Sequence, residues 1–289
     1  MPTLIEAVKR GADYLAARGV EGARGDAERL LADALGVDRM TLYMDHDRPL
    51  CEDERERVRM LLRRRGKREP LQYILGTQPF RELVLSVTPE VLVPRAETEE
   101  VVDVALAEWD RIAKTAEHPR ALDLGTGSGA IALSLAAERP DATVCAVELS
   151  PAALLVARDN ARRLGLDTRV RFFEGDLLGP VAGEGVFHLI VSNPPYLTPE
   201  EWRDAPPEVR DYEPRQALVG GEDGLAVYRR LFAGVTPCLA PGGAVVVEVG
   251  HTQGAAVVDI AGDAGFDVTL TRDLGGRERV VTARAAGSV

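Results

Sequence analysis

The sequence predicts an α/β protein with a doubly wound parallel sheet, preceded by a small helical amino-terminal domain. Two patterns carry this prediction. From about residue 95 onward, short apolar runs alternate with helical segments, which is typical of parallel strands joined by crossover helices. Before about residue 77, apolar residues recur at helical spacing instead. The length of 289 residues suggests one or two domains with a sizeable core.

The first domain is predicted to be helical over residues 1–76. Four apolar residues recur at helical spacing and predict the first helix: Leu4, Val8, Ala12 and Leu15. A second helix is expected around residues 30–35, a short third one follows Asp38 as its cap, and a fourth covers residues 51–65. Gly66 and Pro70 then break the helical pattern. Residues 77–94 are predicted to be a linker or hairpin between the two domains.

The second domain, residues 95–289, alternates between the two kinds of element. Its helices are expected at residues 97–114, 129–137, 151–164, 224–239 and 253–264. Its strands are expected at residues 121–124, 142–147, 170–173, 186–191, 243–249, 266–270 and 280–283. Residues 197–219 contain four prolines and are predicted to be a long loop. Because parallel strands end at a common edge, a binding site is expected just after them.

Composition and charge narrow the possible functions. The net charge of −11 argues against broad, sequence-independent binding to nucleic acid, which needs a cationic surface. One basic cluster lies within residues 55–68, either as a solvated helix face or as a docking surface for an acidic partner or an RNA-containing assembly. The three separated cysteines predict neither disulfides nor a metal site. No apolar run spans a bilayer and no leader pattern is present, so we expect a cytoplasmic protein.

The segment Asn193-Pro194-Pro195-Tyr196 follows a predicted buried strand and is the strongest candidate for a catalytic site. The Asn193 side-chain oxygen and the Pro194 carbonyl can accept the two hydrogens of an –NH2 group. The two prolines fix the backbone and contribute no N–H that would compete for these acceptors. Tyr196 offers an aromatic face for a flat group. The segment therefore predicts a site for a planar nitrogen.

A glycine-rich loop joins the first strand of the sheet to its first helix. Its glycines allow a ligand to approach the backbone closely. The spacing is G-x-G-x-G, whereas dinucleotide enzymes use G-x-G-x-x-G. Five residues of this segment are predicted to contact a cofactor: Asp123, Gly125, Thr126, Gly127 and Gly129.

Acidic residues follow the next two strands. Glu148 can accept hydrogen bonds from ribose hydroxyls, and Asp176 can accept one from an exocyclic amine. Leu177 or Phe173 is expected to cover the ring of the base. Together with the glycine-rich loop, these strand ends predict one nucleoside cleft.

These segments resemble the class I methyltransferases that use S-adenosylmethionine. The resemblance covers residues 95–284 and implies a seven-stranded, mostly parallel, Rossmann-like sheet. It also implies that Asn193 lies near the methyl group of the cofactor and that S-adenosylhomocysteine is the product. The Asn-Pro-Pro-Tyr form is similar to that of members that methylate the adenine amine or the glutamine side-chain amide.

Three further segments, residues 70–76, 91–99 and 213–225, narrow the resemblance. In this order around Asn-Pro-Pro-Tyr they resemble the bacterial peptide chain release factor glutamine methyltransferases over nearly the whole chain. This implies that the target is the glutamine of the Gly-Gly-Gln loop of release factors. The implied substrate-binding residues are Asn193, Pro194, Pro195, Tyr196, Arg95 and Glu97. Two positions depart from the family pattern, which more often has Pro at Ala96 and Asp at Glu148.

Three alternatives stay open. A sister family methylates a glutamine of a large-subunit ribosomal protein, but it lacks the Glu97-Thr98-Glu99 form. A DNA adenine methyltransferase would usually need a basic target-recognition region, which the net charge disfavours. A nucleotide-sensing protein would leave the Asn-Pro-Pro-Tyr segment without a role. We expect release factors as partners, no direct DNA binding and no membrane contact, and take a monomer as the working expectation.

Overall fold

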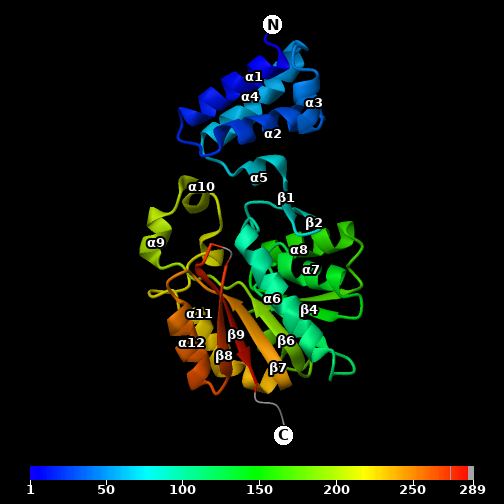
Figure 1. Cartoon of the computed structure of the whole chain (residues 1–289), viewed down its shortest axis with the longest axis vertical. Coiled ribbons are helices and arrows are strands. Elements are labelled where there is room, and N and C mark those ends of the chain that lie inside the picture. Colours follow the sequence, from blue (N-terminus) through cyan, green and yellow to red (C-terminus); the bar gives the residue numbers. More distant parts are fainter. Residues whose placement is uncertain (274, 286–289) are drawn as a thin grey trace. The chain divides into compact units, whose positions relative to one another are not determined.

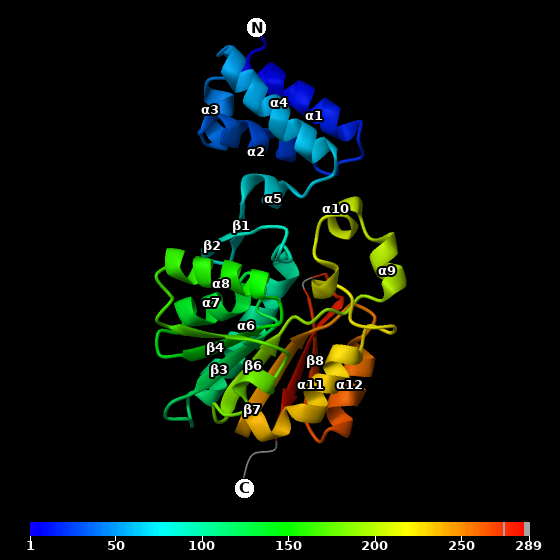
Figure 2. The same ribbon diagram turned by 180° about the vertical axis from the view of Figure 1, so that it is seen from behind.

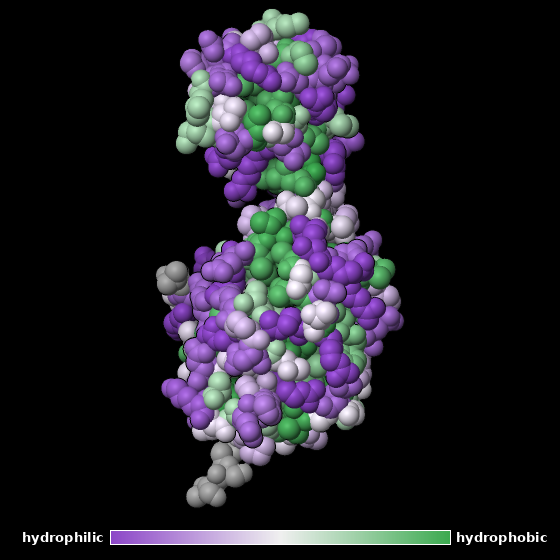
Figure 3. All heavy atoms as spheres, turned by 90° about the vertical axis from the view of Figure 1, so that its right-hand side faces the viewer, coloured by the Kyte–Doolittle hydropathy of each residue, from purple (hydrophilic) through white to green (hydrophobic). Residues whose placement is uncertain are grey.

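The computed structural model describes residues 1–273 and 275–285. The chain forms two compact units (Figure 1). The amino-terminal unit contains residues 1–77 and 206–212, and the catalytic unit contains residues 78–205 and the chain from Glu213 onward. Figure 3 shows that hydrophilic side chains cover much of the visible face of each unit, with hydrophobic residues between them.

Helices build the amino-terminal unit. They are α1 (Leu4–Ala16), α2 (Ala23–Leu35), α3 (Arg39–Met44), α4 (Glu52–Gly66) and α5 (Leu71–Leu75). The first four match the helical spacing of the sequence, and Asp38 caps α3 by accepting a hydrogen bond from the Thr41 N–H at 2.8 Å. We did not predict α5, because five residues between Pro70 and Gly76 are too few to show a helical period.

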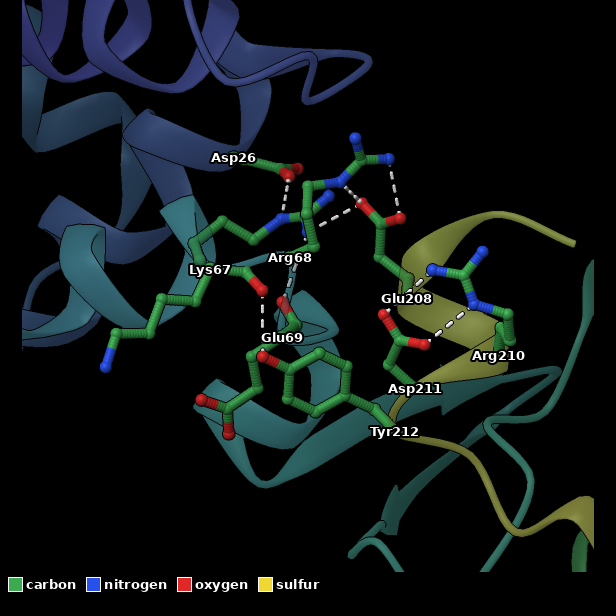
Figure 4. Close-up of polar contacts among 9 residues, drawn as sticks. Asp26, Lys67, Arg68, Glu69, Glu208, Arg210, Asp211 and Tyr212 are labelled. Carbon is green, nitrogen blue, oxygen red and sulfur yellow. Dashed lines mark hydrogen bonds and ion pairs between the residues drawn. The ribbon is translucent and has the colours of Figure 1, made fainter.

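A remote segment completes this unit. Residues 206–212, which include α10 (Pro207–Arg210), contact the end of α4 (Figure 4). Glu208 accepts hydrogen bonds from Arg68 Nε and Nη2, both at 2.6 Å, and from Arg65 Nη1 at 2.9 Å. These charge-assisted bonds hold α10 against the helical unit.

The prediction of residues 197–219 as one long loop is wrong in part. The segment contains α9 (Pro199–Asp204), α10 and a 3₁₀ turn, η2 (Arg215–Ala217). Prolines at the first positions of α9 and α10 cost no internal hydrogen bond, because the first N–H groups of a helix have no partner within it. The prolines therefore start short helices here, where we had interpreted them as loop residues.

A hairpin precedes the main sheet, with β1 (Thr77–Phe80) paired to β2 (Leu83–Ser86). The main sheet has seven strands in the order β5-β4-β3-β6-β7-β9-β8, of which β3 to β7 are parallel and β9 is antiparallel to both of its neighbours. The strands are β3 (Arg120–Leu124), β4 (Thr143–Glu148), β5 (Val170–Glu174), β6 (Phe187–Ser192), β7 (Leu239–Glu248), β8 (Asp267–Arg272) and β9 (Glu278–Arg284).

Helices cover both faces of this sheet (Figure 2). They are α6 (Ala96–Ile112), α7 (Ala130–Glu138), α8 (Pro151–Arg163), α11 (Ala226–Gly234) and α12 (Gly254–Asp263), with 3₁₀ turns η1 (Gly179–Val181) and η3 (Thr236–Cys238). Along β3, Ala121 faces the core under α6, α7 and α8, whereas Leu122 and Leu124 face the core under α11 and α12. This alternation confirms the predicted doubly wound sheet.

The predicted helix at residues 224–239 is shorter in the structure. α11 ends at Gly234, and η3 leads directly into β7 at Leu239. Pro237 lacks the N–H that a continued helix would need.

The strand order changes direction between β3 and β6, and this is the point where open α/β sheets bind their ligands.

Candidate active site

A cavity of about 310 Å³ lies at the carboxyl ends of β3, β4, β5 and β6. Its wall includes Gly125, Gly127, Glu148, Asp176, Leu177 and Asn193. Pro195 lines it as well, so seven predicted site residues from four separate strand ends share one cavity. Its volume lies in the range of small-molecule sites.

The glycine-rich loop leaves space for a ligand. Gly125 and Gly127 have φ angles of 75° and 55°, which favour glycine over other residues. A Cβ added to either would meet no atom within 4 Å, although both glycines line the cavity. The loop is held by the Gly125 and Thr126 N–H groups, which donate to the Val147 carbonyl at 2.9 and 3.1 Å.

Asp123 lies beneath this loop and does not line the cavity. It is fully buried, and its Oδ2 accepts hydrogen bonds from Thr126 Oγ1 at 2.6 Å and from the Ala132 N–H at 3.1 Å. Burial raises the pKa of Asp123 to about 7. Gly129 has a structural role too, because a Cβ there would lie 2.8 Å from the Leu133 side chain. Asp123, Thr126 and Gly129 thus hold the loop, where we had expected direct cofactor contact.

Glu148 braces the other side of the loop and also lines the cavity. Its Oε2 accepts a hydrogen bond from the Gly127 N–H at 2.8 Å, and its Oε1 accepts one from the Ser150 N–H at 2.9 Å. A carboxylate offers about four lone-pair sites, so two stay available for hydroxyl donors. The longer arm of Glu148 is therefore compatible with the predicted ribose contact.

Asp176 and Leu177, which were predicted to contact the base, line the cavity, whereas Phe173 packs into the core under α11 and α12. Asp176 forms an ion pair with Arg230, which also lines the cavity. We did not predict Arg230, because nothing in a helix pattern indicates which face meets a loop. Leu177 has a φ of 47°, an unusual value for a residue with a Cβ, and strained residues of this kind cluster at functional sites.

Asn193 and Pro195 line the cavity, and Pro194 is buried beside them. Asn193 Nδ2 donates to Thr98 Oγ1 at 3.0 Å, and Thr98 Oγ1 donates to Glu248 Oε2 at 2.7 Å. We did not predict roles for Thr98 and Glu248. Glu248 could have been recognised from the sequence as an acidic residue at the carboxyl end of an otherwise apolar strand.

Tyr196 does not line the cavity with the aromatic face that we expected. Its ring packs on the core under α11 and α12, and its hydroxyl lies 3.4 Å from Glu248 Oε1. Burial and, secondarily, the charge of Glu248 raise the pKa of Tyr196. The phenol thus stays protonated and contacts the carboxyl group of Glu248.

Arg95 and Glu97 also lie off the cavity wall. Arg95 Nη2 donates to both carboxylate oxygens of Glu213, at 2.6 and 2.7 Å. Burial, partly offset by Arg95, raises the pKa of Glu213. Glu97 is exposed in the first turn of α6, which begins at Ala96. Arg95 therefore ties the start of α6 to the chain that returns from α10.

Comparison with known proteins decides the family. Residues 6–76 match the model of the PrmC N-terminal domain, and residues 109–205 match that of the methyltransferase small domain. A release factor glutamine methyltransferase from Geobacter sulfurreducens is 48% identical over 94% of this chain and 93% of its own length. The chain belongs to the release factor glutamine methyltransferase family. Another member, from Moorella thermoacetica, is 42% identical over 97% of this chain and 98% of its own.

The fold agrees with this assignment. The solved hMettl16 catalytic domain aligns with a TM-score of 0.58 at 18% identity, covering 76% of this chain and 82% of that one. The chain is thus a methyltransferase of the release factor glutamine methyltransferase family with a class I methyltransferase fold, a class that uses S-adenosylmethionine. Among residues 1–273 and 275–285, none of the helices has the length and apolar character needed to cross a membrane.

Proposed function

We propose that this protein transfers a methyl group from S-adenosylmethionine to the side-chain amide nitrogen of the glutamine in the Gly-Gly-Gln loop of peptide chain release factors, in the cytoplasm. The observation that carries the proposal is the hydrogen bond from Asn193 Nδ2 to Thr98. Because Nδ2 is engaged with Thr98, Asn193 Oδ1 is the side-chain acceptor that Asn193 can offer to a ligand in the cavity that it lines. The Pro194 carbonyl supplies the second acceptor for the amide hydrogens.

The cavity suits the cofactor. Gly125 and Gly127 leave open space where side chains would otherwise project. Glu148 would accept hydrogen bonds from the ribose, Asp176 would accept one from the adenine amine, and Leu177 would contact the base. When bound, the cofactor supplies a methyl group already activated by its sulfonium.

Asn193 and Pro194 act on the acceptor amide. An amide nitrogen is a poor nucleophile because its lone pair is shared with the carbonyl. Two acceptors that hold both N–H hydrogens favour a more pyramidal nitrogen and aim its lone pair toward the cofactor. Positioning of this kind lowers the barrier without a dedicated base. The nitrogen becomes acidic as it forms its new bond and releases one proton to water.

Mass spectrometry of a release factor incubated with the protein and S-adenosylmethionine tests the proposal. We expect one added methyl group on the glutamine of the Gly-Gly-Gln loop, and none with Asn193→Ala. Calorimetry with S-adenosylhomocysteine checks cofactor binding separately. A bound cofactor without a methyl group on this glutamine would overturn the proposed substrate and direct the assay to ribosomal proteins, then to DNA.

We further propose that the release factor contacts a basic groove on the amino-terminal unit. Of the basic cluster at residues 55–68, Arg65 and Arg68 bind Glu208 and Arg64 binds Glu69, so these three have structural roles. Of the other arginines, Arg57 donates to the Ala34 carbonyl at 3.0 Å. Arg55, Arg59 and Arg63 line a groove of about 350 Å³ together with Arg10. Within it, Arg55 and Arg59 pair with Glu52, and Arg10 pairs with Glu6. Leu50, Val58 and Leu62 line the same groove. This combination suits an acidic segment with apolar side chains.

A further inference from the structure

Thr98 and Glu248 form a buried polar pair next to Asn193. Only 4% of Thr98 and 1% of Glu248 is exposed, and neither lines the cavity. A buried carboxyl group is costly unless it is well hydrogen-bonded. Here Glu248 Oε2 accepts from Thr98 Oγ1 at 2.7 Å, and Thr98 Oγ1 accepts from Asn193 Nδ2 at 3.0 Å. The three side chains form one chain of hydrogen bonds that ends at the cavity.

The number of hydrogens that Glu248 and Thr98 carry for these hydrogen bonds determines which way the Asn193 amide faces. A hydroxyl has a single hydrogen, and an ionised carboxylate can only accept. When Glu248 is ionised, the Thr98 hydrogen points to Glu248, so Thr98 can only accept from Asn193. Asn193 must then donate through Nδ2, and its Oδ1 is left for the acceptor amide.

We propose that Thr98 and Glu248 are positioning residues, which hold Asn193 with its oxygen toward the acceptor amide. This inference rests on the proposed function and adds the groups that orient the residue contacting the substrate. Without the pair, the Asn193 amide can turn over and present Nδ2 to a substrate that itself carries N–H donors. Two donors facing each other would leave the glutamine nitrogen unaligned.

The protonation state of Glu248 controls the direction of the hydrogen bonds that join Glu248, Thr98 and Asn193. A protonated Glu248 can donate to Thr98, which frees the Thr98 hydrogen to turn toward Asn193 Oδ1. Burial raises the pKa of Glu248 to about 7, while Thr98 and Arg279 lower it and Glu97 raises it. Two phenols also face the group: the Tyr196 hydroxyl lies near Oε1, and the Tyr228 hydroxyl donates to the Glu248 carbonyl at 2.7 Å. Neither phenol ionises near neutral pH, since burial raises the pKa of both.

Thr98→Val and Thr98→Ser separate orientation from packing. Val keeps the shape of Thr and removes the hydroxyl, whereas Ser keeps the hydroxyl and removes a methyl group. With intact release factor as substrate, we expect Thr98→Val to lower kcat roughly 100-fold, the size of a geometric misplacement, with little change in KM. Thr98→Ser should retain most of the wild-type kcat. A threonine that only fills space would give the opposite order, because Ser leaves a cavity and Val does not.

Glu248→Gln supplies the second readout. We expect wild-type kcat to fall on the acid side, as Glu248 becomes protonated. The Gln carbonyl can accept from Thr98 at any pH, so this loss should be absent from Glu248→Gln. The inference would be overturned if Thr98→Val had the same kcat as the wild type. It would also be overturned if kcat of Glu248→Gln fell at low pH in the same way as kcat of the wild type. A wild-type enzyme that leaves the release factor unmethylated would instead overturn the proposed function, so the two failures are distinguishable.

Discussion

Arg68 and Glu208 lie 140 residues apart in the chain and form an ion pair with two hydrogen bonds of 2.6 Å. Glu208 belongs to a segment that leaves the catalytic unit after α9 and returns to it at Glu213, which pairs with Arg95. Seven residues that come after Asn193 in the sequence, 206–212, therefore belong to the amino-terminal unit. A substitution of Glu208 tests whether its ion pairs hold this segment in the unit.

Glu208→Ala should lower the free energy of unfolding by about 2 kcal/mol, because Arg68 loses its carboxylate partner and the buried guanidinium of Arg65 keeps only Asp26. Burial alone would raise the pKa of Glu208, but the bonds from Arg68 and Arg65 lower it overall. The ionised form thus stabilises the fold, and this stabilisation is lost as pH falls below the ordinary value of 4.5. Urea unfolding followed by circular dichroism measures both effects.

Asp159→Ala is the control for this experiment. Asp159 pairs with Arg162 on an open helix face, where the two side chains are 65% and 62% exposed. Its loss should cost less than about 1 kcal/mol. An equally small effect for Glu208→Ala would show that α10 is not held by its ion pairs.

Gly127→Val should abolish binding of S-adenosylhomocysteine in calorimetry. The new side chain would extend into the cavity, where a Cβ meets no protein atom within 4 Å. Gly165→Val is the matched control, because Gly165 also has a positive φ (70°) and open space around it but does not line the cavity. Both variants carry a similar backbone penalty. Equal affinities in the two variants would refute the role of the loop.

If Asn193 binds the acceptor amide as proposed, Asn193→Ala should reduce methyl transfer at least about 100-fold while leaving cofactor affinity nearly unchanged. Single-turnover transfer to a release factor and calorimetry measure the two quantities separately. A parallel loss of both would mean that Asn193 holds the cofactor and not the amide.

Glu248→Gln should become more stable relative to the wild type as pH rises. Its folded-state pKa of about 7 exceeds the ordinary value of 4.5, so the folded protein binds more protons between these values and loses stability as pH increases. The shift corresponds to about 3 kcal/mol in favour of the variant above pH 7. Urea unfolding across this pH window measures the difference, and a constant difference would show that Glu248 titrates normally.

Arg59→Glu combined with Arg63→Glu should raise KM for intact release factor without affecting a short peptide that carries Gly-Gly-Gln. Both arginines line the basic groove, and reversing their charge would repel an acidic segment. Arg158→Glu combined with Arg162→Glu on α8 is the control with the same change in net charge, because both side chains are exposed and neither lines this groove. Similar KM values for all three proteins would locate docking elsewhere.

Local patterns in the sequence were enough to predict most elements. Helical spacing predicted α1 to α4, and the alternation of apolar runs with helices predicted seven strands and their crossover helices. Glu148, Asp176 and Asn193 were found because polar residues just after buried strands meet at one edge of a parallel sheet. The errors lie where prolines were interpreted as loop residues, at α9 and α10, and where the five-residue α5 had no period to detect.

The sequence by itself thus determined the kinds and order of elements, the strand ends that form the cavity, and the family. The tertiary structure alone decided which side chains meet: Thr98 between Asn193 and Glu248, Glu208 on Arg65 and Arg68, and Asp123 beneath the loop. Hydrophobic periodicity depends on neighbours within a few residues, so it can be recognised locally. These hydrogen bonds, Asp123 with Thr126 excepted, join residues far apart in the chain, and no spacing specifies which donor reaches which acceptor.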